Sequence, residues 1–401
     1  MTVYRAGTKN DHAGPDFSQA RVKIGSFEWI GNVEMHVLSS NWMDHHHDAD
    51  PAYDNVILHV VWNHNHEVKR RDGTVIPTLE LSSRIDKKLL LRYQVMINQP
   101  GGIVCDAVIH RVPKVYLQSM LEGVIMSRLE NKSREVKVLL DRLKNNWEEV
   151  CYQLLCKNFG FKVNEEPFLK LSATLPHAMI LKQSDQLIQI EALLFGQAGF
   201  LNSAGGDAYQ QSLAREYQFL RRKFSLSETP CILPQWRFLR LRPANFPTLR
   251  LAQLAAVCQH NKTIFSRLLE VEKLQEVKEM FVVAPSAYWN DHYRFSKTTK
   301  RHTGQLGEFA IDNIIINTVI PLMVTFGEVQ GEDRYLNRCL NWLQKMNGEN
   351  NNITRKWQAL GIENRTAFES QSLLELYHSY CLRKRCLECH VGSYILRPDP
   401  A

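Results

Sequence analysis

Histidine and acidic residues are concentrated near the start of this chain. Eight of the fifteen histidines lie within the first 66 of 401 residues, and several aspartates accompany them. Imidazole and carboxylate groups bind metal ions and transfer protons near neutral pH, which few other side chains do. We therefore expect the chemistry of the protein to be concentrated in residues 10–66.

Three of these residues are spaced so that a hairpin would bring them together. Residues 20–38 alternate apolar and polar side chains around Gly25-Ser26, a pattern that predicts two paired strands. Glu34 and His36 then share one face of a strand, because side chains two residues apart point the same way. Asp16 comes just before the partner strand. The three side chains are our candidate catalytic residues.

Pro15-Asp16 and Glu34-Met35-His36 resemble the PD…(D/E)xK signature of restriction-endonuclease-like nucleases. The resemblance implies that Asp16 and Glu34 bind Mg²⁺ or Mn²⁺, cations that prefer oxygen ligands, and that the metal activates water. His36 would take the place of the lysine, a departure, since a neutral imidazole can act as an acid, a base or a ligand. The alternative is a plain turn at residues 14–17 followed by a half-buried strand.

The run His45-His46-His47-Asp48 allows a second interpretation. Zn²⁺ accepts imidazole and carboxylate ligands, and His59 on a neighbouring strand could join them. Three consecutive histidines cannot all face one point, and no H-E-x-x-H pattern occurs. We therefore assign His45, His47 and His59 to substrate contacts, with a His-rich transition-metal site as the alternative.

Three cysteines near the end of the chain form a C-x₄-C-x₂-C pattern: Cys381, Cys386 and Cys389. This spacing suits a zinc ion or an iron–sulfur cluster, with Cys105 as the candidate fourth ligand. The arrangement resembles some RecB-type exonucleases, in which one early and three late cysteines hold a [4Fe–4S] cluster that joins the chain ends. The alternative is that these cysteines are buried, reduced packing residues.

A basic segment in the middle of the chain is the candidate nucleic-acid contact. Residues 235–250 contain no acid, and Arg237, Arg240 and Arg242 alternate with aromatic residues there. Arginine interleaved with aromatic residues is typical of nucleic-acid contacts. The alternative is helix packing in which the arginine stems cover apolar surface.

Periodicity divides the chain into a β-rich head and a helical body. Beyond the hairpin, residues 55–62, 75–81 and 102–109 are expected to be strands. From about residue 113 the apolar residues recur every three or four positions, which predicts helices. The helices are expected at 187–201, 208–223, 248–283, 305–327, 333–346 and 365–383. We therefore predict an α+β fold, with a β-rich, restriction-endonuclease-like domain at 1–111 and an α-helical domain at 112–401.

Charge and composition favour a cytoplasmic protein that acts on DNA or RNA. Residues 1–110 hold 11 Lys+Arg against 13 Asp+Glu, which leaves 38 against 29 for the remainder. A basic body suits a polyanion, although a solvated surface gives the same numbers. No membrane span or signal peptide is expected, because Ile311–Phe326 is short and interrupted and the first residues lack an apolar core. Nine cysteines without regular spacing suit reduced thiols.

Seven segments together resemble one family of bacterial proteins of unknown function that is common in Bacteroidetes. They are GPDFSQA, GNVEMHVLSSNW, NVILHVVW, EALLFGQAGFL, RPANFPTLRLAQLAA, INTVIP and YCLRKRCLECHVG. This family brings no established activity with it, so the function rests on the residues above. Three hypotheses follow: a metal-dependent nuclease-like phosphodiesterase, a non-catalytic nucleic-acid-binding or scaffold protein, and a small-molecule metal hydrolase.

Overall fold

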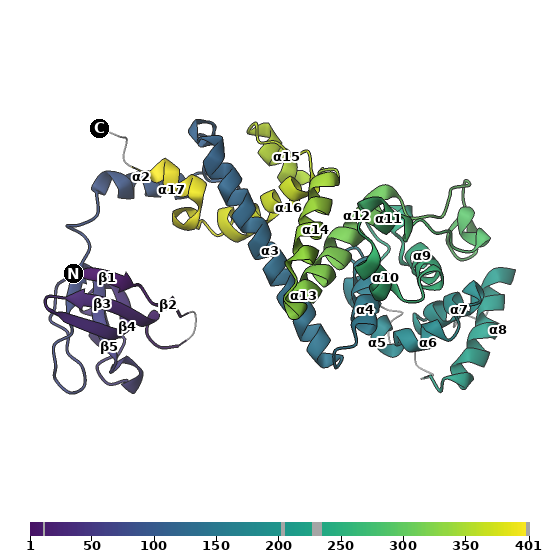
Figure 1. The fold of residues 1–401 in the computed structure, drawn as a ribbon, viewed down its shortest axis with the longest axis horizontal. Helices are drawn as coiled ribbons and strands as arrows, with labels where there is room; N and C mark the ends of the chain where they lie inside the picture. Colours follow the sequence, from purple (N-terminus) through teal and green to yellow (C-terminus); the bar gives the residue numbers. More distant parts are fainter. Residues whose placement is uncertain (11–12, 202–204, 227–234, 398–401) are drawn as a thin grey trace. The chain divides into compact units, whose positions relative to one another are not determined.

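The computed structural model describes residues 1–10, 13–201, 205–226 and 235–397 (Figure 1). It contains two compact units, each of which is described by itself. The first comprises Met1–Cys105 together with the C-terminal residues from Gly392, and the second comprises Asp106–Val391. The chain thus returns to its N-terminal unit at its end, which the division at residue 111 did not anticipate.

The N-terminal unit is built on a mixed sheet, and a mostly helical body follows it, which confirms the predicted α+β class. The strand order is β1-β3-β4-β5-β6, with β2 paired to β3. Pairs among β1, β3 and β4 are antiparallel, whereas β4–β5 and β5–β6 are parallel. The strands are β1 Thr2–Arg5, β2 Thr8–Lys9, β3 Phe17–Ile24, β4 Phe27–Leu38, β5 Val56–Asn63 and β6 Thr78–Glu80.

The predicted hairpin is β3–β4, which turns at Gly25-Ser26. Gly25 adopts a φ of +61° there, a conformation that costs glycine little. The strand register shifts between Phe17 and Ala20, and Gln19 has a φ of +55° at this irregularity. A bulge of this kind bends a strand and changes the direction of its end. It therefore sets where Asp16 meets β4.

Two apolar clusters support the sheet. One contains Ala20, Val22, Val33, Ile57 and Leu58. The other contains Trp42, Tyr53, Val56, Val68 and Ile76, and it fixes the segment between β4 and β5. That segment includes the short helix α1 (Asn41–Asp44) and a 3₁₀ turn at Pro51–Tyr53.

The strand expected at 102–109 is wrong. These residues form turns that lead into a 3₁₀ segment at Ile109–Arg111. Ile103, Val104 and Cys105 are nevertheless buried. A short apolar run has the same sequence pattern in a buried strand and in a buried turn. Periodicity therefore cannot distinguish the two structures. The unit also contains a helix, α2 (Lys87–Ile97).

The second unit is almost entirely helical and surrounds one extended apolar core. Its longest helix is α3 (Lys114–Arg142). The other helices are α4 Trp147–Phe159, α5 Glu165–Thr174, α6 His177–Leu181, α7 Leu187–Gln197, α8 Ala208–Lys223, α9 Pro247–His260, α10 Ile264–Glu270, α11 Leu274–Glu279, α12 Glu308–Ile314, α13 Ile320–Gln330, α14 Asp333–Lys345, α15 Asn352–Ala359, α16 Ala367–Leu376 and α17 His390–Leu396, the last of which crosses the unit boundary. A small hairpin, β7 (His292–Arg294) and β8 (Lys297–Thr298), lies between α11 and α12.

One continuous helical stretch, Glu308–Gln330, is long and apolar enough to cross a membrane by length and composition. Of its most apolar window, 72% is buried inside the protein. A core helix of a soluble protein has this property. π-helical geometry at Ile315–Val319 joins α12 to α13 within the stretch.

Candidate functional site

Strand β4 places Glu34 and His36 on one face of the sheet, as their spacing predicts. The Oε1 atom of Glu34 lies 3.6 Å from Nε2 of His36. Glu34 is only 6% exposed although it carries a carboxylate. In the neighbouring parallel strand β5, His59 is the register partner of Glu34 and is fully buried.

The segment after β4 brings two further histidines to this face. The side chain of Asn41 accepts a hydrogen bond from the backbone N–H of Leu38 at 3.0 Å, which fixes the turn into α1. His46 has a φ of +59° and is exposed. This left-handed residue separates His45 and His47, and both of them face His36. Two of the three consecutive histidines therefore reach one point.

Three histidine nitrogens converge at this point, and the Glu34 carboxylate lies beside two of them. His36 Nε2 lies 3.1 Å from Nδ1 of His45. Nε2 of His47 lies 3.5 Å from Glu34 Oε1. One nitrogen from each of His36, His45 and His47 lies within 4.8 Å of the others. Ligands about 2.0–2.1 Å from a tetrahedral zinc ion are about 3.3–3.4 Å apart, so these separations suit a transition-metal ion.

His59 supports His36 from behind. Nδ1 of His36 lies 2.8 Å from Nε2 of His59. When His36 binds a metal through Nε2, its Nδ1–H donates to His59, which fixes the orientation of the ring. Among the residues that the structure describes, the Nδ1 atom of His59 is buried and has no hydrogen-bond partner. His59, predicted as a substrate contact, thus lies too deep to touch a substrate.

Two aromatic residues form a wall beside the histidines. Tyr53 stacks on His47 with ring centroids 3.7 Å apart. Trp42 makes edge contacts with His47 and with His59. These residues restrict the imidazoles to one orientation. Sequence reasoning missed both residues, because an aromatic residue in a polar loop is not specific for a site.

Burial governs the protonation of the cluster. It raises the pKa of Glu34 to about 7, and the nearby Asp16 carboxylate adds to this effect. Burial lowers the pKa of His36 to about 4 and that of His59 to about 3, and it also lowers the pKa of His47. The contact between Glu34 and His36 is therefore not an ion pair near pH 7. His36, His47 and His59 are therefore neutral near pH 7, and a neutral imidazole keeps the lone pair that a metal needs.

Asp16 lies next to Glu34, but its carboxylate accepts a hydrogen bond from the backbone of β4. Its backbone N–H donates to Oε2 of Glu34 at 3.0 Å. Its Oδ2 accepts the backbone N–H of Met35 at 2.9 Å. These two hydrogen bonds hold the hairpin and orient the Glu34 carboxylate. Of the three predicted catalytic residues, Glu34 and His36 thus meet the further histidines directly, whereas Asp16 positions Glu34.

The C-terminal cysteines lie in the second unit, at the end of the π-helical segment Tyr377–Cys381 and around the 3₁₀ turn Cys386–Glu388. All three are buried. Burial raises the pKa of the Cys386 thiol, and the neighbouring Cys389 raises it further. Cys105 belongs to the N-terminal unit, and its role as a fourth ligand stays a prediction.

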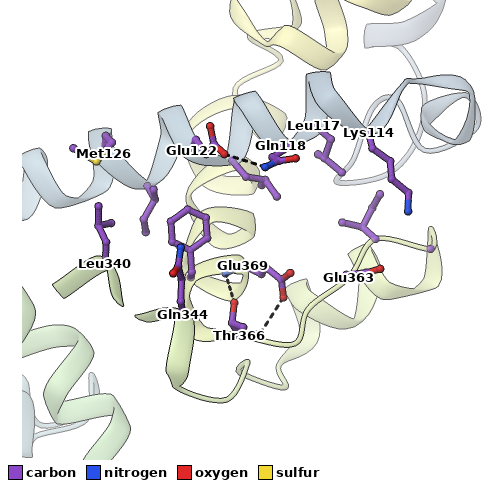
Figure 2. A pocket seen from close by; sticks show the side chains of 15 residues that line it. Lys114, Leu117, Gln118, Glu122, Met126, Leu340, Gln344, Glu363, Thr366 and Glu369 are labelled. Carbon is purple, nitrogen blue, oxygen red and sulfur yellow. Dashed lines mark hydrogen bonds between the residues drawn. The ribbon is translucent and has the colours of Figure 1, made fainter. Parts of the chain in front are cut away.

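The predicted nucleic-acid contacts Arg237, Arg240 and Arg242 are all exposed, in the second unit. A cavity of about 710 Å³ lies elsewhere in that unit, between α3, α14 and the segment Gly361–Glu369 (Figure 2). Its wall includes apolar residues such as Leu117 and Met126. Its polar side chains bond one another, as Gln118 does with Glu122. The lining includes Lys114 and Glu363 but no histidine, unlike the cluster beside β4.

Comparison with other proteins identifies a family but no activity. Nothing matches among curated proteins, and nothing matches among solved structures. One family model, described as "Protein of unknown function (DUF2851)", matches residues 1–352. The match spans the sheet, the histidine cluster and most of the helical body. The chain therefore belongs to the DUF2851 family of proteins of unknown function.

Proposed function

We propose that the N-terminal unit is a hydrolase that depends on a divalent transition metal and cleaves phosphodiester bonds, in the manner of a nuclease. The observation that carries this proposal is the convergence of nitrogens of His36, His45 and His47, with Glu34 Oε1 beside His36 and His47. Three imidazole ligands suit Zn²⁺ or Mn²⁺ better than Mg²⁺, which prefers oxygen ligands and water.

The proposed roles follow from geometry. His36, His45 and His47 are the metal ligands, and a water molecule completes the coordination, as in catalytic zinc sites with three protein ligands. The exposed position of His45 leaves one side of the site accessible to substrate. Glu34 adjoins two of these histidines, where its carboxylate would accept a proton from a water that a bound metal activates. Asp16 orients Glu34 through the hydrogen bond from its backbone N–H.

The hairpin supports phosphodiester cleavage over other hydrolysis. Asp16 precedes β3, Glu34 and His36 lie two apart on β4, and a hydrogen bond joins the two strands at Asp16. This is the arrangement that the PD…(D/E)xK resemblance implies, with His36 in place of the lysine. A metal ion there would generate the nucleophile and neutralise the phosphate charge. DNA or RNA is the proposed substrate.

A second candidate is hydrolysis of a small molecule at the same metal. It is favoured by the acidic surroundings, because Asp44, Asp48 and Asp50 are close enough to act on the titration of His36 or His47. Negative charge around a site repels a polyanion more than a small substrate. In both candidates the metal ligands are the same.

The test compares His47→Ala with His46→Ala, a matched control that removes a neighbouring exposed imidazole outside the cluster. Metal content and cleavage of DNA, RNA and bis(4-nitrophenyl) phosphate are measured with Mn²⁺ or Zn²⁺. We expect His47→Ala to lose metal affinity by at least about 100-fold and to lose cleavage, while His46→Ala retains both.

Each outcome has a distinct meaning. Cleavage of the small diester alone supports the second candidate. A metal-loaded wild type that binds nucleic acid without cleaving any substrate indicates the non-catalytic alternative. Equal metal content and activity in both variants would remove the proposed site. Glu34→Gln, with Glu28→Gln on the same strand as control, tests the base: we expect lost cleavage with metal retained.

Two further assignments belong to this proposal. Cys381, Cys386 and Cys389 hold a zinc ion or a [4Fe–4S] cluster; their shared burial at the end of the second unit supports this. The protein works in the cytoplasm. Buried thiols such as Cys151 and Cys156, whose pKa values burial raises, support a reducing compartment.

A further inference from the structure

Two basic segments of the second unit lie against each other. Residues 235–250 contain Arg237, Arg240 and Arg242, and residues 292–302, around the β7–β8 hairpin, contain Arg294, Lys297, Lys300 and Arg301. Neither segment contains an aspartate or glutamate. All seven of these cationic side chains are exposed.

Arg294 joins the two segments. Its guanidinium carbon lies 4.3 Å from the ring centre of Phe238 and 4.4 Å from that of Phe246. The hydroxyl of Thr248 also donates to the backbone carbonyl of Tyr293 at 2.5 Å. Contacts of a guanidinium with two aromatic rings hold it in one orientation at little cost in side-chain entropy. The hairpin is therefore fixed beside the arginine segment.

The surface continues from Arg237 to Lys162. The Asn164 side chain accepts the N–H of Arg237 at 2.9 Å and donates to its carbonyl oxygen at 3.0 Å. A cavity of about 680 Å³ there is lined by Lys157, Lys162, Lys170 and Arg237. Lys170 is paired with Glu166 and Lys157 with Glu135. Lys162 is exposed and has a φ of +67°.

Among the described residues, the cations of this surface have no carboxylate partner, unlike some exposed cations elsewhere in the unit. Within the described ranges, Lys162, Arg237, Arg240, Arg242, Arg294, Lys297, Lys300 and Arg301 make no ion pair with an acid. Lys262 and Arg365, by contrast, pair with Asp185 and Glu363.

The acidic residues at the border of this surface contact groups other than its cations or lie beside the cavity. Asp207 accepts hydrogen bonds from Tyr288 and from the N–H of Ser296. Asp291 contacts His292. Glu165 and Glu166 lie at the edge of the cavity. The positive charge of the surface therefore exceeds the negative charge around it.

We propose that this basic surface binds the phosphate backbone of a nucleic-acid strand. The surface is defined by Lys162, Arg237, Arg240, Arg242, Arg294, Lys297, Lys300 and Arg301. The proposal rests on the proposed function in that it names where the second unit holds the substrate. Unpaired cations in a row, with arginine stacked on aromatic rings, are suited to phosphates and to unstacked bases. An anionic membrane is disfavoured because the tip of the 238–241 turn offers one large exposed apolar side chain, Leu239.

The test uses the full chain with Glu34→Gln and a chelator, so that binding is measured without cleavage. Charge reversal at Arg240 and Lys300 (R240E/K300E) is compared with K262E/R365E, which changes the net charge equally at paired positions. Affinity for a labelled single-stranded DNA or RNA of about 20 nucleotides is measured against salt, and both double variants are checked for an unchanged melting temperature.

We expect R240E/K300E to weaken binding roughly tenfold or more and to reduce the slope of log affinity against log salt by about 1.4, two phosphate contacts. The control should keep the wild-type slope. Equal losses in both variants, or no binding by wild type, would overturn the proposal. Binding to phosphatidylserine vesicles without binding to the oligonucleotide would overturn it as well.

Failure here is distinguishable from failure of the metal site. Metal-dependent cleavage of bis(4-nitrophenyl) phosphate by R240E/K300E with Glu34 intact reports the catalytic unit alone. If wild type cleaves this diester but binds no oligonucleotide, the proposed hydrolase function is supported and the proposed nucleic-acid surface is contradicted. If the oligonucleotide binds but no diester is cleaved, the nucleic-acid surface is supported and the hydrolase function is contradicted.

Discussion

Nδ1 of His36 lies 2.8 Å from Nε2 of His59, although the two residues sit on different strands, β4 and β5. In the proposed metal site, Nε2 of His36 faces the other ligand atoms. Its Nδ1 is hydrogen-bonded to the buried His59, which orients the His36 ring. Such support by a second residue is characteristic of histidines that bind metal.

Replacing His59 should therefore weaken metal binding without removing a ligand. We expect His59→Leu to lower the affinity for Zn²⁺ by about 10–100-fold. His59→Gln should lose less, because an amide oxygen can accept the Nδ1–H of His36. Competition with a chromogenic chelator measures both variants, and His64→Leu at an exposed position is the control. Equal affinities in the Leu and Gln variants would mean that His59 serves packing alone.

Glu191 on α7 predicts a pH dependence of stability in the second unit. Burial raises its pKa above the ordinary 4.5, although Ser286 and Tyr209 donate hydrogen bonds to it. The folded protein thus binds this proton more tightly than the unfolded chain. Its stabilising effect is complete below pH 4.5 and is lost as the pH rises toward the raised pKa.

The melting temperature of wild type relative to Glu191→Gln should consequently fall as the pH rises from about 5 to about 8. Calorimetry of both proteins across this range measures the difference. Glu270→Gln, at an exposed position on α10, should differ from wild type by a constant amount. A constant difference for Glu191→Gln too would show that this carboxyl keeps an ordinary pKa.

Gly196 is required by the packing of α7 against α8. A Cβ atom at this position would lie 2.2 Å from the ring of Tyr217. Gly196→Ala should therefore destabilise the unit by about 1–3 kcal/mol. In α3, a Cβ at Gly123 would meet nothing within 4 Å, so Gly123→Ala should stabilise by about 0.5–1 kcal/mol. Chemical denaturation gives both signs, and a stabilising Gly196→Ala would contradict the close approach.

The cysteine site predicts a metal that one substitution removes. Wild type purified without added metal should contain zinc or iron, and Cys386→Ser should lose it, because the remaining thiolates hold either species more weakly. Elemental analysis and the visible absorbance of a cluster measure this. Cys258→Ala, a buried thiol at the end of α9, is the control and should keep the metal. A metal-free wild type would contradict the assignment.

Local patterns along the chain were enough to predict the class of the fold and the strand that carries Glu34 and His36. Alternation over residues 20–38 predicted the β3–β4 hairpin, and period-two geometry placed Glu34 and His36 on one face, because both features depend only on local backbone geometry. The helical period likewise located most helices of the second unit. The family resemblance agrees with the match to DUF2851.

Which histidines lie close together depends on the tertiary structure. The left-handed conformation of His46 and the turn held by Asn41 direct His45 and His47 to His36, and the parallel pairing of β4 with β5 puts His59 behind it. Each of these depends on contacts between segments that no local pattern encodes. The Arg294 contact with Phe238 is of the same kind. Spacing along the chain can fix a shared face, whereas convergence at one point requires the packed fold.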